Sequence, residues 1–131
     1  MSRPFSPATA MRLYYNPRCS KSRAALALLE EAGHTPQVRD YLKNPPSAAE
    51  LGALLAGLDS PPASLVRTGD TAFADSGYSA QTLDRERVLS LLLDQPALMQ
   101  RPVIQLGTHA LIARPPERVF ELIDSRQDSD S

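Results

Sequence analysis

The chain has 131 residues, of which 42% are hydrophobic and 22% are charged, proportions that are ordinary for a globular domain. There are 14 Lys and Arg residues against 15 Asp and Glu residues, and the resulting net charge of -1 argues against bulk electrostatic binding of nucleic acid or membrane. No apolar run approaches the ~18–20 residues that a membrane-spanning helix needs.

The chain contains a single cysteine, Cys19. It cannot form an internal disulfide, which excludes a disulfide-stapled scaffold and favours a reducing compartment, so we expect the cytoplasm. The first ten residues lack the apolar stretch of a secretory signal, and the end of the chain is rich in Asp and Ser. We predict a single domain over residues 11–124, with 1–10 and 125–131 flexible.

The first part of this domain has the pattern of a strand, a helix and a second strand. Residues 11–15 are apolar and aromatic and end at an Asn-Pro pair, which is typical of a strand that enters a turn. Apolar residues recur at helical spacing over 20–32, and a glycine then ends the helix. Residues 37–42 form the second strand, with Val38 and Tyr41 as its larger anchors. A unit of this size predicts parallel strands.

The middle of the chain lacks strand alternation and is predicted to be helical. Ser47 and Glu50 have the spacing of a capping box ahead of an apolar helix face. Asp84 is a suitable N-cap for a longer helix over residues 85–94. The residues of that helix predicted to face inward are Val88, Leu89, Leu92 and Leu93.

The last part of the domain returns to β structure. Two short apolar runs, 103–106 and 110–113, flank a glycine-containing turn and predict an antiparallel hairpin. The segment Arg114-Pro115-Pro116-Glu117 then opens a final helix. The order β-α-β, several helices, β-β-α predicts an α/β fold of the thioredoxin-like type, with one mixed sheet and a helical insertion at about 46–100 between its halves.

The cysteine lies where the first strand is predicted to end and the first helix to begin. A lone cysteine is most often a small buried hydrophobic residue. The residues around Cys19 are instead polar, basic or turn-forming, and a helix start can favour a bound negative charge by up to ~2 kcal/mol. We therefore expect a thiolate at neutral pH, beside a site that attracts an anion.

The spacing around the cysteine also limits its chemistry. Ser22 stands where a dithiol oxidoreductase has its second cysteine, so the chain cannot resolve an adduct on Cys19 through an internal disulfide. Any covalent intermediate must be released by water or by an external thiol such as glutathione.

Three arginines stand at points where the predicted elements begin or end. Arg67 ends a short helix, and Arg114 precedes a proline after the hairpin. Arg101 directly precedes Pro102 at the start of the third strand, and this step is a candidate cis peptide beside the thiol-bearing turn. A single arginine is most often a solvated surface residue. Two or three guanidinium groups around a thiolate would instead bind an arsenate- or phosphate-like anion.

Five segments share a pattern with one known family over residues 11–124. They are Tyr14-Tyr15-Asn16-Pro17-Arg18-Cys19-Ser20-Lys21-Ser22-Arg23, Tyr41-Leu42-Lys43-Asn44-Pro45-Pro46, Leu65-Val66-Arg67, Gln100-Arg101-Pro102-Val103-Ile104 and Ala113-Arg114-Pro115-Pro116-Glu117. In this order they resemble the glutaredoxin-dependent arsenate reductase family. That family has a thioredoxin-like fold with a helical insertion, in agreement with the pattern above.

The resemblance implies an oxidoreductase with no bound cofactor. Cys19 matches the nucleophile that attacks arsenate and forms a thiol–arsenate adduct. Arg67, Arg101 and Arg114 match the arginines that hold the oxyanion and its reduced product. Glutathione, as co-substrate, would attack the adduct and release arsenite, and a glutaredoxin would reduce the remaining mixed disulfide. The residue matching Ser22 donates a hydrogen bond to the thiolate.

The sequence departs from well-studied members of the family at the cysteine turn. Those proteins carry a histidine before the Asn-Pro pair, where this chain has Tyr15. Our hypothesis is that the positive charges of Arg18 and Lys21 replace the contribution of that histidine to thiolate stability. Asn16 and Pro102 are expected to support the site.

Two alternative functions remain open at this point. The first is a glutathione-dependent thiol reductase with a different substrate, in which the arginines bind glutathione carboxylates. The second is a non-enzymatic module that binds RNA polymerase as a stress regulator, although that branch typically carries a Cys-x-x-Cys switch that Ser22 removes. The sequence has no metal-ligand spacing and no phosphate-loop or dinucleotide fingerprint, so we expect no metal site.

Overall fold

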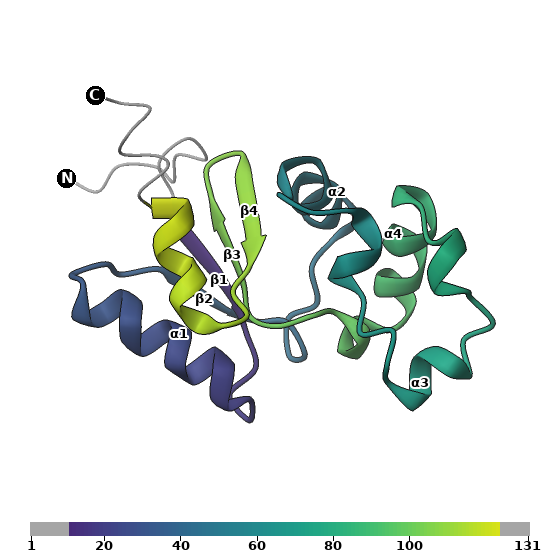
Figure 1. Ribbon diagram of the computed structural model, residues 1–131, viewed down its shortest axis with the longest axis horizontal. Helices are drawn as coiled ribbons and strands as arrows, with labels where there is room; N and C mark the ends of the chain where they lie inside the picture. The colour runs from purple at the N-terminus through teal and green to yellow at the C-terminus, as the bar shows by residue number, and fades with distance from the viewer. Residues whose placement is uncertain (1–10, 124–131) are drawn as a thin grey trace.

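The centre of the fold is a four-stranded mixed sheet, within a computed structural model that describes residues 11–123 (Figure 1). The strands are β1 (Met11–Tyr15), β2 (Gln37–Asp40), β3 (Val103–Leu106) and β4 (His109–Ile112). They lie in the order β2-β1-β3-β4, with β1 and β2 parallel and the other neighbours antiparallel. The predicted fold class is confirmed. The predicted flexible ends, and residue 124 of the predicted domain, lie outside the described residues.

The sheet separates two hydrophobic cores because successive side chains of a strand point to opposite faces. The register pairs Leu13 with Ile104, and Ile104 with Leu111, so these three side chains share one face. Their sequence neighbours point to the other face. These neighbours include Tyr14, Val103 and Ile112. The cores on the two faces are therefore built from different helices.

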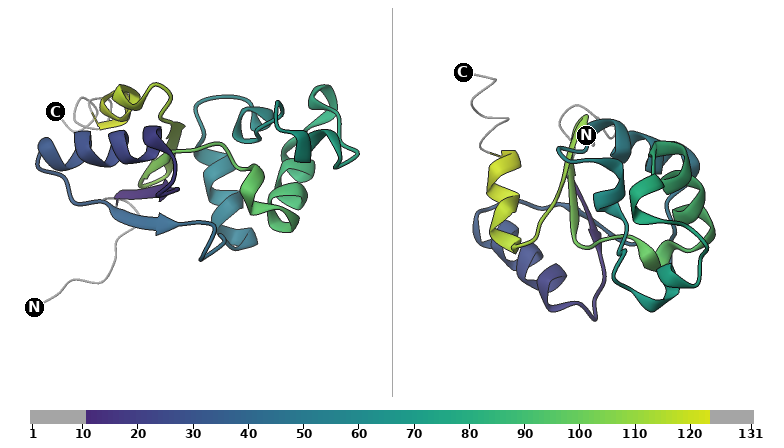
Figure 2. Two further views of the ribbon diagram at one scale, coloured as in Figure 1. Left: turned by 90° about the horizontal axis from the view of Figure 1, so that it is seen from below. Right: turned by 45° about the vertical axis from the view of Figure 1, so that its right-hand side comes forward.

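Helix α1 (Ser20–Glu31) and the last helical segment cover the first face. The last segment follows the hairpin and consists of η4 (Pro116–Arg118) and the helical residues 119–123. Figure 2 shows these two helices side by side, apart from the insertion. The end of α1 is set by Gly33, which has a φ of 89°. Its N–H donates to the carbonyl of Glu30, and the next N–H donates to that of Leu29. This is the Schellman arrangement, which favours glycine at the left-handed position.

The segment between β2 and β3 is helical throughout its regular structure, as predicted. It contains α2 (Ala48–Gly57), η1 (Pro62–Leu65), α3 (Thr71–Ala74), η2 (Ala80–Thr82), α4 (Arg85–Asp94) and η3 (Pro96–Leu98). Its buried leucines pack with Tyr14, Val103 and Ile112 to form the second core. The predicted inward face of α4 is confirmed for Val88 and Leu92, which are buried, and Leu89 packs against the core. It is wrong for Leu93, which is 46% exposed, while Leu91 is buried in its place.

The second strand is shorter than predicted and lies at an edge of the sheet. It ends at Asp40, and the predicted anchor Val38 is 43% exposed. Val38 pairs with Leu13 and so faces the α1 side, but an edge position is covered less completely than a central one. The other predicted anchor, Tyr41, follows the strand and is fully buried.

Glu50 joins the insertion to the sheet. It completes the predicted capping box with Ser47 at the start of α2. Its carboxylate also accepts two hydrogen bonds from Arg39 of β2, at 2.8 and 3.0 Å, and one from Arg12 of β1, at 3.0 Å. The Glu50 side chain therefore caps the start of α2 and pairs with arginines of two strands.

Candidate active site

Cys19 is the N-cap residue of α1, at the end of the turn that leaves β1. Asn16 shapes this turn, because its carbonyl accepts from the N–H of Cys19 and its Oδ1 accepts from the N–H of Arg18, both at 2.9 Å. The N–H of Asn16 donates to Oγ of Ser22 at 3.3 Å, and both of these side chains are buried. The turn therefore holds the thiol, which is partly exposed, at a fixed place over the helix start.

The groups around the sulfur favour its ionised form. Partial burial raises the pKa of Cys19, but several hydrogen bonds outweigh this effect. They come from the backbone N–H and the hydroxyl of Ser22, from the Arg101 side chain and from the N–H of Lys21. Their combined effect lowers the pKa from 9.0 to about 7. About half of the thiol is then thiolate at neutral pH, and the thiolate is the nucleophile.

The basic residues near the cysteine contribute differently from our hypothesis on Arg18 and Lys21. Among the described residues, the side chains that lower the pKa of Cys19 are those of Ser22 and Arg101, whereas Lys21 acts through its backbone N–H. The Arg18 side chain is exposed and lines a hollow of about 240 Å³ next to the turn. The other residues of this hollow are Asn16, Pro17, Asp40, Leu42 and Lys43.

Arg67 reaches the site from the insertion, through a short pairing of two chain segments. The N–H of Arg67 donates to the carbonyl of Leu98 at 2.8 Å, and the N–H of Gln100 donates to the carbonyl of Leu65 at 2.7 Å. The segment that ends η1 thus runs antiparallel to the segment that leads into β3. This pairing places the backbone of Arg67 opposite Leu98, in the segment that leads to Arg101 and β3.

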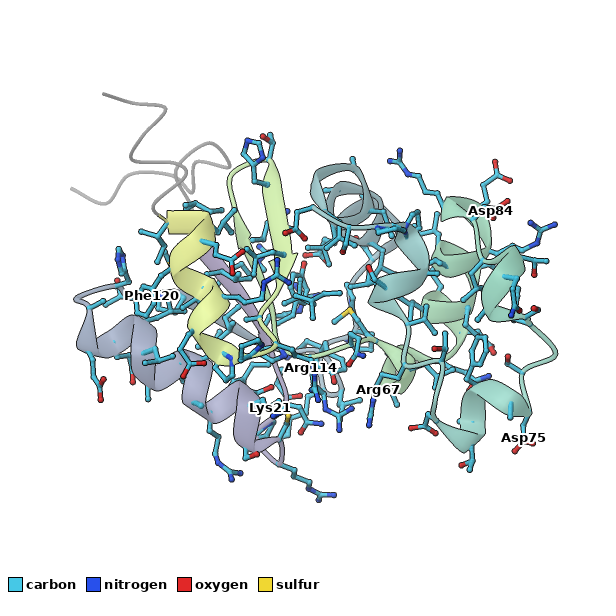
Figure 3. The ribbon with its side chains drawn as sticks, in the orientation of Figure 1. Lys21, Arg67, Asp75, Asp84, Arg114 and Phe120 are labelled. Atoms are coloured by element: carbon cyan, nitrogen blue, oxygen red, sulfur yellow. The ribbon has the colours of Figure 1, made fainter. Side chains whose placement is uncertain are left out.

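Arg101 and Arg114 stand at the two ends of the β hairpin. Both precede a proline through a cis peptide bond, which confirms the prediction for the Arg101–Pro102 step. Nη1 of Arg114 donates to the carbonyl of Arg101 at 2.9 Å. Arg67 and Arg114 also line one hollow of about 240 Å³, together with Thr68, Gly69, Asp70 and Gln100. Nη1 of Arg67 lies 3.7 Å from Oδ2 of Asp70 in this hollow. In Figure 3 both labelled guanidinium groups lie where the sheet meets the insertion.

The predicted site residues therefore converge. Arg101 interacts with the thiol, Arg114 bonds to the backbone of Arg101, and Arg67 shares the hollow of Arg114. Pro102 is buried, and its carbonyl accepts from the N–H of Ala113 at 2.9 Å, which joins the two ends of the hairpin. The sulfur is thus connected through Arg101 to two further arginines, an arrangement suited to displacement on a tetrahedral oxyanion.

One residue at this site was assigned only a packing role from the sequence. Tyr41 follows β2, and burial raises the pKa of its hydroxyl against the opposing effects of the nearby Arg101, Asn16 and Arg67 side chains. The signal that could have identified it is topological. Parallel strands end at the same edge of a sheet, so the residue after β2 adjoins the turn after β1.

Residues 11–123 contain neither a metal-binding cluster nor a membrane-spanning helix. No group of three or more His, Cys, Asp or Glu side chains in this range is arranged to hold a metal ion. No helix in the same range is both long enough and apolar enough to cross a membrane.

Comparison with known proteins shows the family to which the chain belongs. The ArsC family model matches residues 14–122. The chain is 39% identical over 114 residues to the uncharacterized protein YfgD of Escherichia coli, a match that covers 86% of this chain and 96% of YfgD. It is 37% identical over 110 residues to an arsenate reductase of Neisseria meningitidis serogroup A, with coverage of 83% and 94%.

The fold is shared as well. The structure of an arsenate reductase from Vibrio cholerae matches with a TM-score of 0.76 at 35% identity, over 87% of this chain and 98% of that chain. The family match runs from the end of β1 to the last helical segment, and it includes Cys19 and the three arginines. This chain is therefore a member of the ArsC family, as its five sequence segments predicted.

Proposed function

We propose that the protein reduces arsenate to arsenite, with Cys19 as the nucleophile and with glutathione and glutaredoxin as the reductants. The observation that supports this most directly is the interaction of the Arg101 side chain with Cys19. A cation that stabilises the thiolate can also bind the oxyanion that the thiolate attacks. The relatives named arsenate reductase support the choice of substrate. A free thiol as the nucleophile also requires a reducing compartment, such as the cytoplasm.

In the first step, the Cys19 thiolate attacks arsenic and a new S–As bond forms. One arsenate hydroxyl group takes up a proton from solvent and leaves as water, so arsenic stays pentavalent in the adduct. The arginines neutralise the charge of the oxyanion and orient it, which favours attack over repulsion between two anions. Arg67, Arg101 and Arg114 hold the oxyanion, and Arg101 also interacts with the sulfur.

In the second step, a glutathione thiolate attacks the sulfur of Cys19. The S–As bond breaks, its electron pair stays on arsenic, and arsenite leaves as a trivalent product. The two electrons come from the two thiols, which are now joined as a mixed disulfide. A glutaredoxin thiolate then attacks the glutathione sulfur and frees the Cys19 thiolate. This route suits a chain whose sequence has one cysteine and therefore no internal resolving thiol.

A coupled assay tests this proposal. The protein is mixed with glutathione, glutathione reductase, a glutaredoxin and NADPH, and NADPH consumption is followed with and without arsenate. We expect one arsenite per NADPH, and no turnover by Cys19→Ser. Arg85→Ala, an exposed arginine of α4, serves as the matched control and should keep full activity. Turnover by Cys19→Ser, or none by the wild-type protein, would contradict the proposal.

A glutathione-dependent thiol reductase is the second candidate, favoured by the hollow beside the turn. Arg18 and Lys43 line this hollow, and such cations suit the carboxylates of glutathione. The same assay separates the two candidates when arsenate is replaced by a mixed disulfide of glutathione and a small thiol. Turnover of the disulfide without turnover of arsenate would favour the second candidate.

A further inference from the structure

Two buried polar atoms at the site have no partner. Within residues 11–123, the buried side-chain nitrogen and oxygen atoms without a hydrogen bond are Oη of Tyr41 and Nε of Arg101. Buried polar groups are nearly always hydrogen-bonded, because an unmade bond leaves the cost of desolvation uncompensated. Two donors left over in one place indicate a ligand that accepts from both.

Tyr41 meets the requirements for such a donor. Its side chain is fully buried, so its hydroxyl does not contact bulk water, and the side chains around it must shift for an anion oxygen to reach it. Burial raises the pKa of Tyr41 although Arg101 and Arg67 oppose this, so the phenol keeps its proton near neutral pH. The groups that oppose this rise in pKa are Arg101, Arg67 and Asn16. The hydroxyl of Tyr41 therefore lies near two of the predicted anion-binding arginines and near the cysteine turn.

We propose that Tyr41 is a further substrate-binding residue, whose hydroxyl donates a hydrogen bond to an oxygen of the oxyanion held by Arg67 and Arg101. The inference rests on the proposed function, because it adds a ligand to the same anion. The free Nε of Arg101 would donate to a second oxygen. Oη of Tyr41 and Nε of Arg101 would then both be paired when the substrate is bound.

A second tyrosine provides the matched control. Tyr14 of β1 is also fully buried, and it packs in the same core as Tyr41. Its hydroxyl accepts a hydrogen bond from Nη1 of Arg12 at 3.4 Å, on the side of the Glu50 network. Tyr14→Phe and Tyr41→Phe thus each remove one buried hydroxyl from the same core. The hydroxyl of Tyr14 has a hydrogen-bond partner in the structure, whereas that of Tyr41 has none.

The experiment measures anion binding and stability for the wild-type protein and both variants. Binding of arsenate and of inorganic phosphate is measured by titration calorimetry, kcat and KM by the coupled assay, and Tm without ligand by calorimetry. We expect Tyr41→Phe to weaken anion binding and to lower kcat/KM about tenfold or more, the effect of losing one hydrogen bond to a charged group. Its Tm without ligand should equal or exceed that of the wild type, because no bond is lost. Tyr14→Phe should bind anions normally.

The outcomes separate this inference from the proposed function. If the wild-type protein turns over arsenate and Tyr41→Phe matches it within twofold in both affinity and kcat/KM, the inference alone is wrong. A fall of several degrees in the Tm of Tyr41→Phe would also overturn it, because the hydroxyl would then have a structural partner. If the wild-type protein neither binds nor reduces arsenate, both the inference and the proposed function are wrong.

Discussion

Arg114 donates a hydrogen bond from Nη1 to the backbone carbonyl of Arg101, at 2.9 Å. The bond crosses from one end of the β hairpin to the other, so it fixes the Arg114 guanidinium against the segment that carries Arg101. Arg101 in turn interacts with the sulfur of Cys19. Arg114 is thus linked to Arg101, and Arg101 to the nucleophile Cys19.

This linkage predicts that the arginines differ in their effect on the thiol. Arg101→Ala should raise the pKa of Cys19 and lower kcat/KM, because the same side chain serves the sulfur and the anion. Arg67→Ala should lower kcat/KM by about tenfold or more, as expected when a charged hydrogen bond worth about 1.5–3 kcal/mol is lost. It should leave the alkylation profile of Cys19 unchanged. An equal shift of that profile in both variants would contradict this division.

The thiol itself should titrate near neutral pH. The rate of alkylation by iodoacetamide should rise with pH, reach half of its maximum near pH 7 and level off above it, because the thiolate reacts and its pKa is about 7. Ser22→Ala should move the midpoint to higher pH, since it removes a hydrogen bond that lowers this pKa. The chain has one cysteine, so the signal comes from one site. A midpoint above about pH 8 for the wild-type protein would argue against thiolate stabilisation.

Acid should weaken the join between the insertion and the sheet. Hydrogen bonding by Arg39, against the opposing effect of partial burial, lowers the pKa of Glu50 from 4.5 to about 2. The pKa is lower in the folded state, so the ionised carboxylate stabilises the fold above about pH 4.5, and this contribution is lost as the pH falls towards 2. Urea unfolding between pH 5 and pH 2.5 should show a smaller pH dependence for Glu50→Gln. Glu31→Gln, at an exposed position at the end of α1, is the control and should follow the wild type.

The last residue of α2 should not tolerate a side chain. A Cβ at Gly57 would collide with the backbone carbonyl of Thr108 in the β hairpin, whereas a Cβ at Gly52 of the same helix would meet nothing within 4 Å. Gly57→Ala should therefore destabilise the protein by about 1–3 kcal/mol, as overpacking does. Gly52→Ala should be neutral or stabilising by up to about 1 kcal/mol, because alanine is the better helix former. Equal free energies of unfolding for the two variants would contradict a close contact at Gly57.

The sequence was sufficient for the order of elements but not for every helix face. Periodicity and caps predicted the helix at 85–94, yet three consecutive leucines, Leu91, Leu92 and Leu93, left its inward direction open to a one-residue error. One residue turns a helix by about 100°. Only the neighbouring helices decide which leucine is buried, and their placement is not a local property of the sequence.

The arginines show the same limit at the site. Nothing in the sequence pattern around Arg67, Arg101 or Arg114 shows that they meet, and only the family resemblance grouped them. Tyr41 was predicted to be buried, and it is, but an aromatic residue after a strand is typical of a core. Its unpaired hydroxyl could be recognised only once the surrounding polar groups were placed.

The candidate site lies between groups that belong to differently packed parts of the molecule. Cys19, Arg101 and Arg114 come from the sheet and its flanking turns, whereas Arg67 comes from the insertion. An anion that contacts all of these groups connects two separately packed halves of the molecule, so its binding free energy adds to the cohesion between them. Substrate would then act as a temporary structural element, and each product release would return the junction to its packing contacts and the Glu50 ion pairs.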